Sequence, residues 1–235
     1  MTKKIAVITG VGSSVGTGTA IARRFSEGGY EVVMLSRNAD RLKKHEQTIA
    51  NSHGFACDVT DEAAVNRTIA AVKEKLGAPT VLIHNAVQGT MGSFLEVSPE
   101  NLLQNFKVNT MGLMYLARAL APDMVQAESG TIIATGNTSA FRGKAGFAAF
   151  APTKAAQRVL AESIARDLNP KGIHVAYLII DAVINVPWTR GFWPGKPDSF
   201  FIEPATIAEE VWRLSHQSKG GWAFNAEIRP FGEQW

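Results

Sequence analysis

Short, nearly continuous apolar runs alternate with longer amphipathic stretches along the first 180 residues of the chain. The apolar runs lie at residues 4–9, 31–35, 80–84, 131–135 and 173–180. Runs of this kind are typical of parallel strands that are covered on both faces. The amphipathic stretches lie at residues 19–28, 39–50, 61–76, 98–125 and 152–169. The alternation predicts an α/β fold with right-handed crossovers and a doubly wound, mostly parallel sheet of about seven strands.

The composition favours one domain over residues 1–235. The chain has 235 residues, of which 46% are hydrophobic, and this is enough for one sizeable core. The net charge of +3 is spread without a basic block, so no nucleic-acid partner is expected. No run approaches the roughly 18 to 20 apolar residues that span a membrane, and the apolar run near the start is too short for a signal peptide. Cys57 is the only cysteine, which favours a reducing, cytoplasmic location.

The alternation ends after residue 181. Residues 182–204 are rich in proline, glycine and aromatic side chains, and they precede a predicted helix at 204–216 and a predicted strand near 222–228. A long irregular insertion in a compact α/β domain is usually a lid or a binding loop. The aromatic side chains Trp188, Phe192 and Trp193 are therefore expected either to close on an apolar substrate or to pack within the lid or a subunit contact.

A glycine-rich turn, TGVGSSVGTG at residues 9–18, joins the first strand to the first helix. Glycines let the backbone turn tightly and bring N–H groups close to a pyrophosphate at the N-terminus of the helix, whose dipole favours negative charge. The alternative is a flexible turn without a ligand. The residues expected to contact phosphate are Gly10, Gly12, Ser13, Ser14, Gly16 and Gly18.

The second strand ends at Ser36 and Arg37, where an acidic residue would bind the ribose of NAD. A guanidinium can instead bind the 2′-phosphate of NADP, which a carboxylate would repel. This pair therefore favours NADP(H) over NAD(H), unless Arg37 is simply a solvated residue at the start of the next helix. No metal site is expected.

Five short motifs occur in order on the predicted elements: the glycine turn, CDVTD at 57–61, HNA at 84–86, KVNTMG at 107–112 and FAPTK at 150–154. Together they resemble the short-chain dehydrogenase/reductase family over residues 4 to about 190. The resemblance implies a single Rossmann-type domain and NAD(P)-dependent chemistry on a carbonyl or alcohol. It also implies a homodimer or homotetramer built on the helices at 98–125 and 152–169.

The resemblance assigns further cofactor contacts. Asp58 and Val59 match the pair that packs against the adenine, and Asn85 and Ala86 match residues that line the cofactor. Val87 replaces the usual glycine after them. Farther along the chain, Val183 falls where the backbone normally binds the nicotinamide carboxamide.

At the catalytic positions, the resemblance is incomplete. Lys154 matches the lysine that binds the nicotinamide ribose and lowers the pKa of a tyrosine four residues earlier. Phe150 stands at the place of that tyrosine and has no titrating atom. Asn109 matches the asparagine that holds an active-site water, although its side chain could instead bond its own helix and kink it.

Two other catalytic positions are changed. Asn137 stands where the family serine polarises the carbonyl, beside Thr138 and Ser139, and its amide can donate a hydrogen bond in the same way. Ile180 and Asp181 replace a Pro-Gly pair. Asp181 is either an alternative acid and base or a capped or solvated turn residue.

None of the three tyrosines is expected to replace the missing phenol. Tyr30 opens the second strand at the end remote from the ligand edge, and Tyr115 lies nearly two helical turns beyond Asn109. Tyr177 lies within the strand at 173–180 and can approach the site only from beneath. The sequence thus leaves two functions open, an NADP(H)-dependent oxidoreductase with an altered acid and base, and a catalytically inactive dinucleotide-binding sensor or partner protein.

Overall fold

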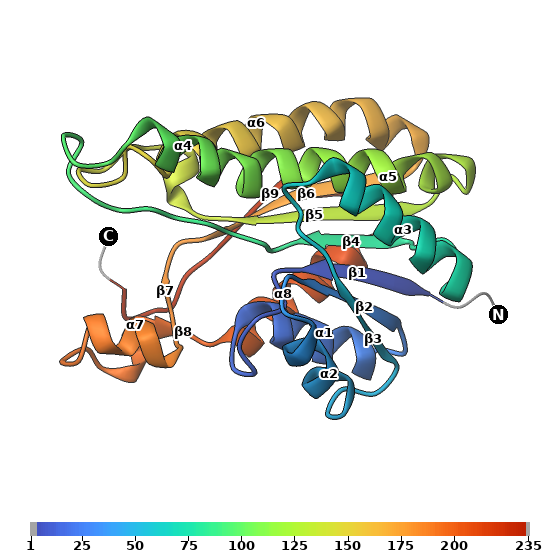
Figure 1. Ribbon diagram of the computed structural model, residues 1–235, viewed down its shortest axis with the longest axis horizontal. Helices are drawn as coiled ribbons and strands as arrows, with labels where there is room; N and C mark the ends of the chain where they lie inside the picture. Colours follow the sequence, from blue (N-terminus) through green and yellow to red (C-terminus); the bar gives the residue numbers. More distant parts are fainter. Residues whose placement is uncertain (1–3, 234–235) are drawn as a thin grey trace.

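The computed structural model describes residues 4–233, which form a seven-stranded parallel sheet with helices on both faces (Figure 1). The strand order is β3-β2-β1-β4-β5-β6-β9, and every neighbouring pair is parallel. The strands are β1 (Ile5–Thr9), β2 (Glu31–Ser36), β3 (Ser52–Ala56), β4 (Val81–His84), β5 (Gly130–Gly136), β6 (Ile173–Ile180) and β9 (Asn225–Ile228). The predicted doubly wound α/β fold, with about seven strands, is confirmed.

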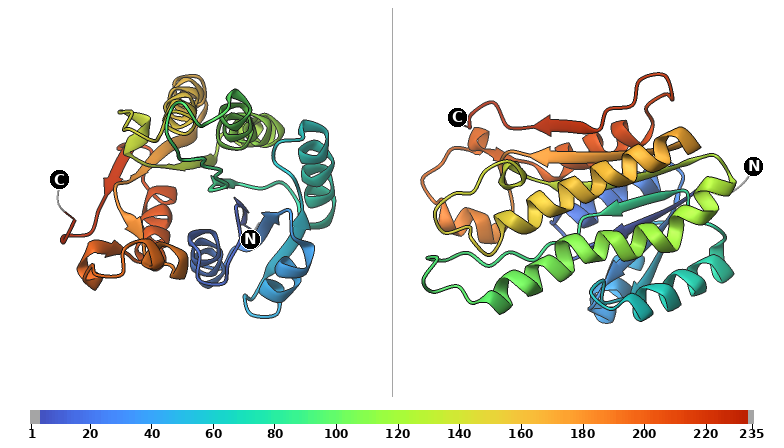
Figure 2. Two further views of the ribbon diagram at one scale, coloured as in Figure 1. Left: turned by 60° about the vertical axis from the view of Figure 1, so that its left-hand side comes forward. Right: turned by 90° about the horizontal axis from the view of Figure 1, so that it is seen from above.

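Two helical layers enclose the sheet (Figure 2). One layer contains α3 (Glu62–Leu76), α4 (Pro99–Phe106), α5 (Gly112–Gln126) and α6 (Ala151–Leu168). The other contains α1 (Thr17–Glu27), α2 (Ala39–Glu46) and α8 (Pro204–Ser215). Successive residues of a strand point to opposite faces, so Ile5 and Val7 pack in one core while Ala6 and Ile8 pack in the other. This two-sided burial is the reason that the strand sequences are almost continuously apolar.

Polar residues at the ends of the strand-to-helix connections cap the N-termini of the helices. Asn38 accepts a hydrogen bond from Arg41 N at 2.9 Å, and Asp61 accepts one from Ala64 N at 3.1 Å. Each side chain satisfies one of the N–H groups that a helix start leaves free. These caps place α2 and α3 directly after short turns at the carboxyl ends of β2 and β3.

One strand was not expected from the sequence. Strand β3, with the sequence SHGFA, lies at the edge of the sheet and is only partly buried, so it lacks the apolar run that identifies the inner strands. Gly54 lies where α2 crosses the strand, and a Cβ atom there would be 2.7 Å from Leu42 Cβ. The glycine that weakens the sequence signal therefore allows the helix to pack close to the strand.

The amphipathic stretch predicted at 98–125 is one continuous helical segment with an irregular centre. Ser98 caps α4, and residues Lys107–Met111 form a π-helix between α4 and α5. A π-helical turn widens the backbone ring and changes which carbonyls are available for other partners. The turn contains Asn109, one of the predicted site residues.

The segment at 182–204 is more regular than its composition suggested. Strand β7 (Val183–Ile184) pairs with β8 (Phe201–Ile202) in a small parallel sheet, and the short helix α7 (Pro187–Phe192) lies between them. In Figure 1 this unit projects beyond the carboxyl ends of the main strands. Within residues 4–233, no helix is both long enough and apolar enough to cross a bilayer.

The strand order reverses between β1 and β4. The chain runs outward from β1 to β2 and β3, then crosses back to β4 and continues in the opposite direction. At such a point the connections leave in opposite directions, which opens a crevice at the carboxyl ends of the strands. The predicted site residues that follow β1, β4, β5 and β6 all lie at this edge.

The contact between Gly54 and α2 makes a testable stability prediction. Gly54→Ala is expected to lower the free energy of unfolding by about 1–3 kcal/mol, because the new methyl group overlaps Leu42. Urea denaturation would measure the change. Gly143→Ala is the matched control, since a Cβ there meets no atom within 4 Å. Equal stability of the two variants would contradict this account of β3.

Candidate active site

The glycine turn and the loop after β4 meet backbone to backbone. Gly10 has φ of +69°, and a Cβ atom there would lie 2.8 Å from the backbone of Ala86. Gly18, in the first turn of α1, would place a Cβ 2.4 Å from the Gly10 carbonyl oxygen. Neither position has room for a side chain, so both glycines are required by the packing itself.

The turn leaves the start of α1 facing outward. Gly16 is the N-cap residue and supplies no side chain to the free N–H groups of the first turn. The Ser13 carbonyl accepts from Gly16 N at 2.9 Å and from Thr19 Oγ1 at 2.8 Å, which makes the loop a compact turn. Ser13 and Ser14 are exposed beside this helix start, so the arrangement can hold an anion.

A cavity of about 300 Å³ lies between the turn, β2 and the loop after β4. It brings together seven of the residues predicted to bind the cofactor: Gly10, Gly12, Ser36, Arg37, Asp58, Val59 and Ala86. Arg41 also lines it, although it was not identified from the sequence. Arg41 lies in the first turn of α2, just after Arg37, and a second cation so close to the end of β2 is the signal that could have revealed it. Two guanidinium groups therefore border the cavity at the end of β2.

A buried hydrogen-bond chain connects β1, β4 and the π-helix. Thr9 Oγ1 accepts from the backbone N–H groups of Asn85 at 3.0 Å and Ala86 at 2.9 Å, and it lies 3.3 Å from His84 Nδ1. His84 Nε2 lies 3.2 Å from the Val108 carbonyl oxygen. Burial and the nearby Lys154 charge lower the pKa of His84 to about 3, so the ring is neutral. Its Nε2–H then donates to Val108 and its Nδ1 accepts from Thr9.

Asn109 organises the loop after β4. Its Oδ1 accepts from Gln88 N at 2.9 Å, and its Nδ2 donates to the Gln88 carbonyl at 2.8 Å and to Thr153 Oγ1 at 2.8 Å. The side chain thus bonds neighbouring elements and not its own helix, so the alternative of a side-chain-induced kink is wrong. The Asn109 carbonyl accepts from Gln157 Nε2 at 2.7 Å.

Lys154 is almost fully buried, with 2% of its surface exposed. Its Nζ donates to the Thr135 carbonyl at 2.9 Å and to Gln157 Oε1 at 2.5 Å. Burial lowers the pKa of Lys154 to about 7. Gln157, which was not identified from the sequence, therefore contacts both Lys154 and the backbone of Asn109 and fixes their separation.

Tyr177 lies beneath this group, on β6. Its hydroxyl is 3.4 Å from the Lys154 carbonyl and 3.5 Å from Gln157 Oε1, and its ring is fully buried under Gly136. Burial raises the pKa of the Tyr177 phenol. The hydroxyl therefore supports the Lys154 region from below and lines neither of the two cavities that contain predicted site residues.

Phe150 is also buried, with 4% of its surface exposed. A Cβ at Gly89 would lie 3.2 Å from its ring, and its centroid is 6.3 Å from that of Phe147. The ring thus packs under the loop after β4. Phe150, Lys154 and Asn109 line neither the cavity at the glycine turn nor the cavity between the loop after β5 and residues 182–204.

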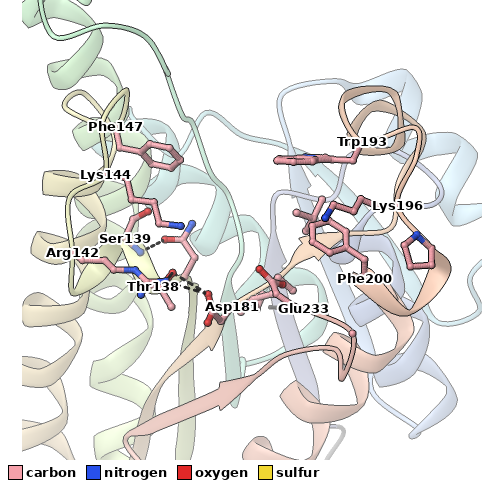
Figure 3. Close-up of a pocket in the computed structure, with 16 residues that line it drawn as sticks. Thr138, Ser139, Arg142, Lys144, Phe147, Asp181, Trp193, Lys196, Phe200 and Glu233 are labelled. Carbon is pink, nitrogen blue, oxygen red and sulfur yellow. Dashed lines mark hydrogen bonds and ion pairs between the residues drawn. The ribbon is translucent and has the colours of Figure 1, made fainter. Parts of the chain in front are cut away.

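A second cavity of about 570 Å³ lies between the loop after β5 and the segment 182–204 (Figure 3). Among the predicted site residues it contains Asn137 and Val183. Its aromatic walls are formed by Phe147, Trp193 and Phe200, while Trp188 and Phe192 are exposed and pack against each other. Of the three lid aromatics named from the sequence, only Trp193 faces the cavity.

Asn137 and Asp181 differ in the atoms that they leave free. Asn137 Oδ1 accepts from Ser139 N at 3.1 Å, so its amide N–H groups are the part available to a ligand. The Asp181 carboxylate accepts from Thr138 Oγ1 at 3.1 Å and lies 3.3 Å from Arg229 and 3.9 Å from Arg142. Asp181 is therefore a paired carboxylate within a charged group, not a free acid.

Known proteins share this architecture. A sequence profile of short chain dehydrogenases matches residues 4–188. An uncharacterized oxidoreductase of Staphylococcus aureus (strain MRSA252) is 28% identical over 232 residues, which cover 98% of each chain.

Two solved structures are also similar. A metagenomic short-chain oxidoreductase in complex with NADP has a TM-score of 0.84 and 28% identity, with 97% of each chain covered. An alcohol dehydrogenase of the archaeon Thermococcus sibiricus, complexed with 5-hydroxy-NADP, has a TM-score of 0.85 and 27% identity, with 99% of this chain and 98% of that one covered.

The burial of Lys154 predicts a pH-dependent stability. Its pKa is near 10.5 in the unfolded chain and about 7 in the folded one, so the unfolded state binds the extra proton between these values. Wild-type stability, measured relative to Lys154→Met, should therefore rise as the pH increases from about 7 to 10, by a few kcal/mol. Denaturant unfolding of both proteins across this range measures the difference. A constant difference would show that Lys154 is not buried as described.

Proposed function

The chain belongs to the short-chain dehydrogenase family, and we propose that it is an NADP(H)-dependent oxidoreductase that interconverts a carbonyl compound and an alcohol with an altered acid and base. The observation that supports the choice of cofactor most strongly is the pair of guanidinium groups, Arg37 and Arg41, at the end of β2. A guanidinium binds a phosphate through two parallel hydrogen bonds, and two of them suit the 2′-phosphate that distinguishes NADP from NAD.

The remaining contacts fit the length of a dinucleotide. Asp58 and Val59 border the adenine end of the cavity, while Ser13, Ser14 and the start of α1 suit the pyrophosphate. Lys154 would bind the nicotinamide ribose, whose hydroxyls would compete with Thr135 and Gln157 for its N–H groups. The other proposed contacts are Gly10, Gly12, Gly16, Gly18, Ser36, Asn85, Ala86 and Val183.

The second cavity is the proposed substrate site. When bound, the cofactor supplies the hydride. Asn137 directs its free amide N–H groups at the substrate oxygen and stabilises the negative charge that develops there. Phe147, Trp193 and Phe200 favour a substrate with an apolar body, and the lid that carries Trp193 excludes water from it.

We further propose that the protein acts in the cytoplasm as a homodimer or homotetramer. The helices α4 and α6 carry the exposed apolar side chains Leu103 and Val159, each with 59% of its surface exposed. A contact across these helices would cover both. In such an assembly, each chain would keep its own complete site.

The cofactor proposal predicts that the protein binds NADPH more tightly than NADH. Arg37→Ala and Arg41→Ala should each weaken NADPH binding about tenfold, because each removes a charged hydrogen bond to phosphate, and should leave NADH binding unchanged. Fluorescence titration measures both affinities. Lys44→Ala, an exposed cation on the same helix, is the matched control. Equal binding of both cofactors by the wild-type protein would disprove the preference.

The proposal of turnover is tested with Phe150→Tyr. The wild-type protein is expected to reduce at least one member of a panel containing an aldehyde, an aryl ketone, a β-keto ester and a 1,2-diketone, followed by NADPH absorbance. Because the ring at 150 is buried and does not line the substrate cavity, the added hydroxyl should change kcat by less than about tenfold. Activity in the variant alone would identify the natural chain as a dinucleotide-binding protein without turnover.

A further inference from the structure

One carboxyl group in the substrate cavity has an oxygen without a partner. The chain returns to the cavity after β9, and Glu233 reaches its floor close to Asp181 (Figure 3). Among residues 4–233, Glu233 Oε2 is one of three buried side-chain oxygen or nitrogen atoms that have no hydrogen-bond partner. A buried polar atom without a partner is costly, and such atoms are concentrated where a ligand completes the contacts.

We propose that Glu233 is the proton donor that replaces the missing tyrosine during carbonyl reduction. This inference rests on the proposed oxidoreductase function and deepens it. Glu233 and Asn137 line the same cavity, so one substrate oxygen can face both the amide N–H groups and the carboxyl. Phe150 does not line this cavity, and therefore the proton has to come from another wall.

The backbone around Glu233 is fixed by neighbouring segments. Gly232 N donates to the Ser199 carbonyl at 3.1 Å, and Glu233 N donates to the Pro230 carbonyl at 3.2 Å. Gly232 also packs so close to Ser199 that a Cβ would lie 2.6 Å from its carbonyl oxygen. These contacts hold the carboxyl between the lid and the end of β9.

The surroundings favour the protonated acid. Burial raises the pKa of Glu233, and the negative charge of Asp181 raises it further, while the smaller influence of each of the cations Lys144, Arg229 and Arg142 lowers it. Lys196 lines the same cavity from the lid. Two carboxylates near one another cannot both ionise at low cost, and Asp181 already has Arg229 as its counter-charge.

The step balances in atoms and electrons. The carbonyl carbon accepts a hydride from the reduced nicotinamide, forming a C–H bond, and the π electron pair of the carbonyl moves to its oxygen. That oxygen takes the proton from the Glu233 carboxyl, whose O–H bond breaks. The substrate is reduced to an alcohol and NADPH is oxidised to NADP⁺, leaving a Glu233 carboxylate that solvent reprotonates.

Glu233→Gln tests the proposal in the full chain. It should lower kcat for reduction by about 10²-fold or more, because a positioned acid typically contributes 10²–10⁴, and should leave NADPH affinity unchanged. The control is Glu227→Gln, which removes a carboxylate that pairs with Arg229 outside this cavity and should retain wild-type kcat. In the wild-type protein kcat should fall as the pH rises through the Glu233 pKa.

A second readout does not depend on activity. The wild-type protein is labelled with [δ-¹³C]glutamate and studied by NMR without added cofactor, and the Glu233 resonance is the one that is absent from Glu233→Gln. This resonance should titrate above the ordinary pH range of a glutamate. Asp181→Asn should move that titration, and the loss of kcat, to lower pH because a negative neighbour is removed.

The outcomes separate the two proposals. If the wild-type protein is active and Glu233→Gln retains its kcat, or if Glu233 titrates at or below the ordinary value, only the role of Glu233 is overturned. If the wild-type protein binds NADPH but reduces no member of the panel, the oxidoreductase proposal fails and the proton-donor role fails with it. Should Glu233→Gln unfold, Glu233→Asp, which keeps a carboxyl but lacks the glutamate label, assigns the resonance, and its titration and the shift of that titration in Asp181→Asn decide the question.

Discussion

The contact between Gly10 and the backbone of Ala86 is the constraint on which the site depends. It brings the turn after β1 against the loop after β4, where the strand order reverses. Thr9 can then accept from the two N–H groups of that loop, and His84 can reach the π-helix. Asn109 holds the far end of the same loop through Gln88. The close backbone contact between Gly10 and Ala86 thus aligns the turn after β1, the loop after β4 and the π-helix around one crevice.

The two halves of the site differ in how far they could be predicted. The glycine turn and Arg37 are local features, because each follows a strand that its apolar run identifies, and the Asp58–Val59 pair was recognised from the motif CDVTD. The structure brings them to one cavity. Arg41, His84 and Gln157 were missed because their importance comes from tertiary contacts. His84 contacts groups 24 and 75 residues away, Gln157 donates to a carbonyl 48 residues away, and Arg41 reaches the cavity from the first turn of α2. Strand β3 was missed for a related reason, since an edge strand beside a helix needs Gly54 more than it needs an apolar run.

The changes at the catalytic positions form a consistent set. Phe150 is packed under Gly89, and the nearby polar groups satisfy one another: Lys154 with Gln157 and Thr135, and Asn109 with Gln88 and Thr153. Each of these buried polar side chains therefore has hydrogen-bond partners without a phenol at position 150. In the second cavity, Asn137 offers amide N–H groups and several charged side chains gather. In the sequence, the changes are visible as Phe150, Asn137 and the Ile180–Asp181 pair at positions where the family has other residues.

The hydrogen bond from Gly232 to Ser199 ties the last part of the described chain to the lid. If the proposed lid at 182–204 moves to admit substrate, this hydrogen bond would carry the segment after β9 with it. The carboxyl that we propose as the acid would then meet bulk water in the open state and be isolated with the substrate in the closed state. The timing of proton uptake is thereby linked to the opening of the cavity, which would make product release and recharging of the acid a single event in each cycle.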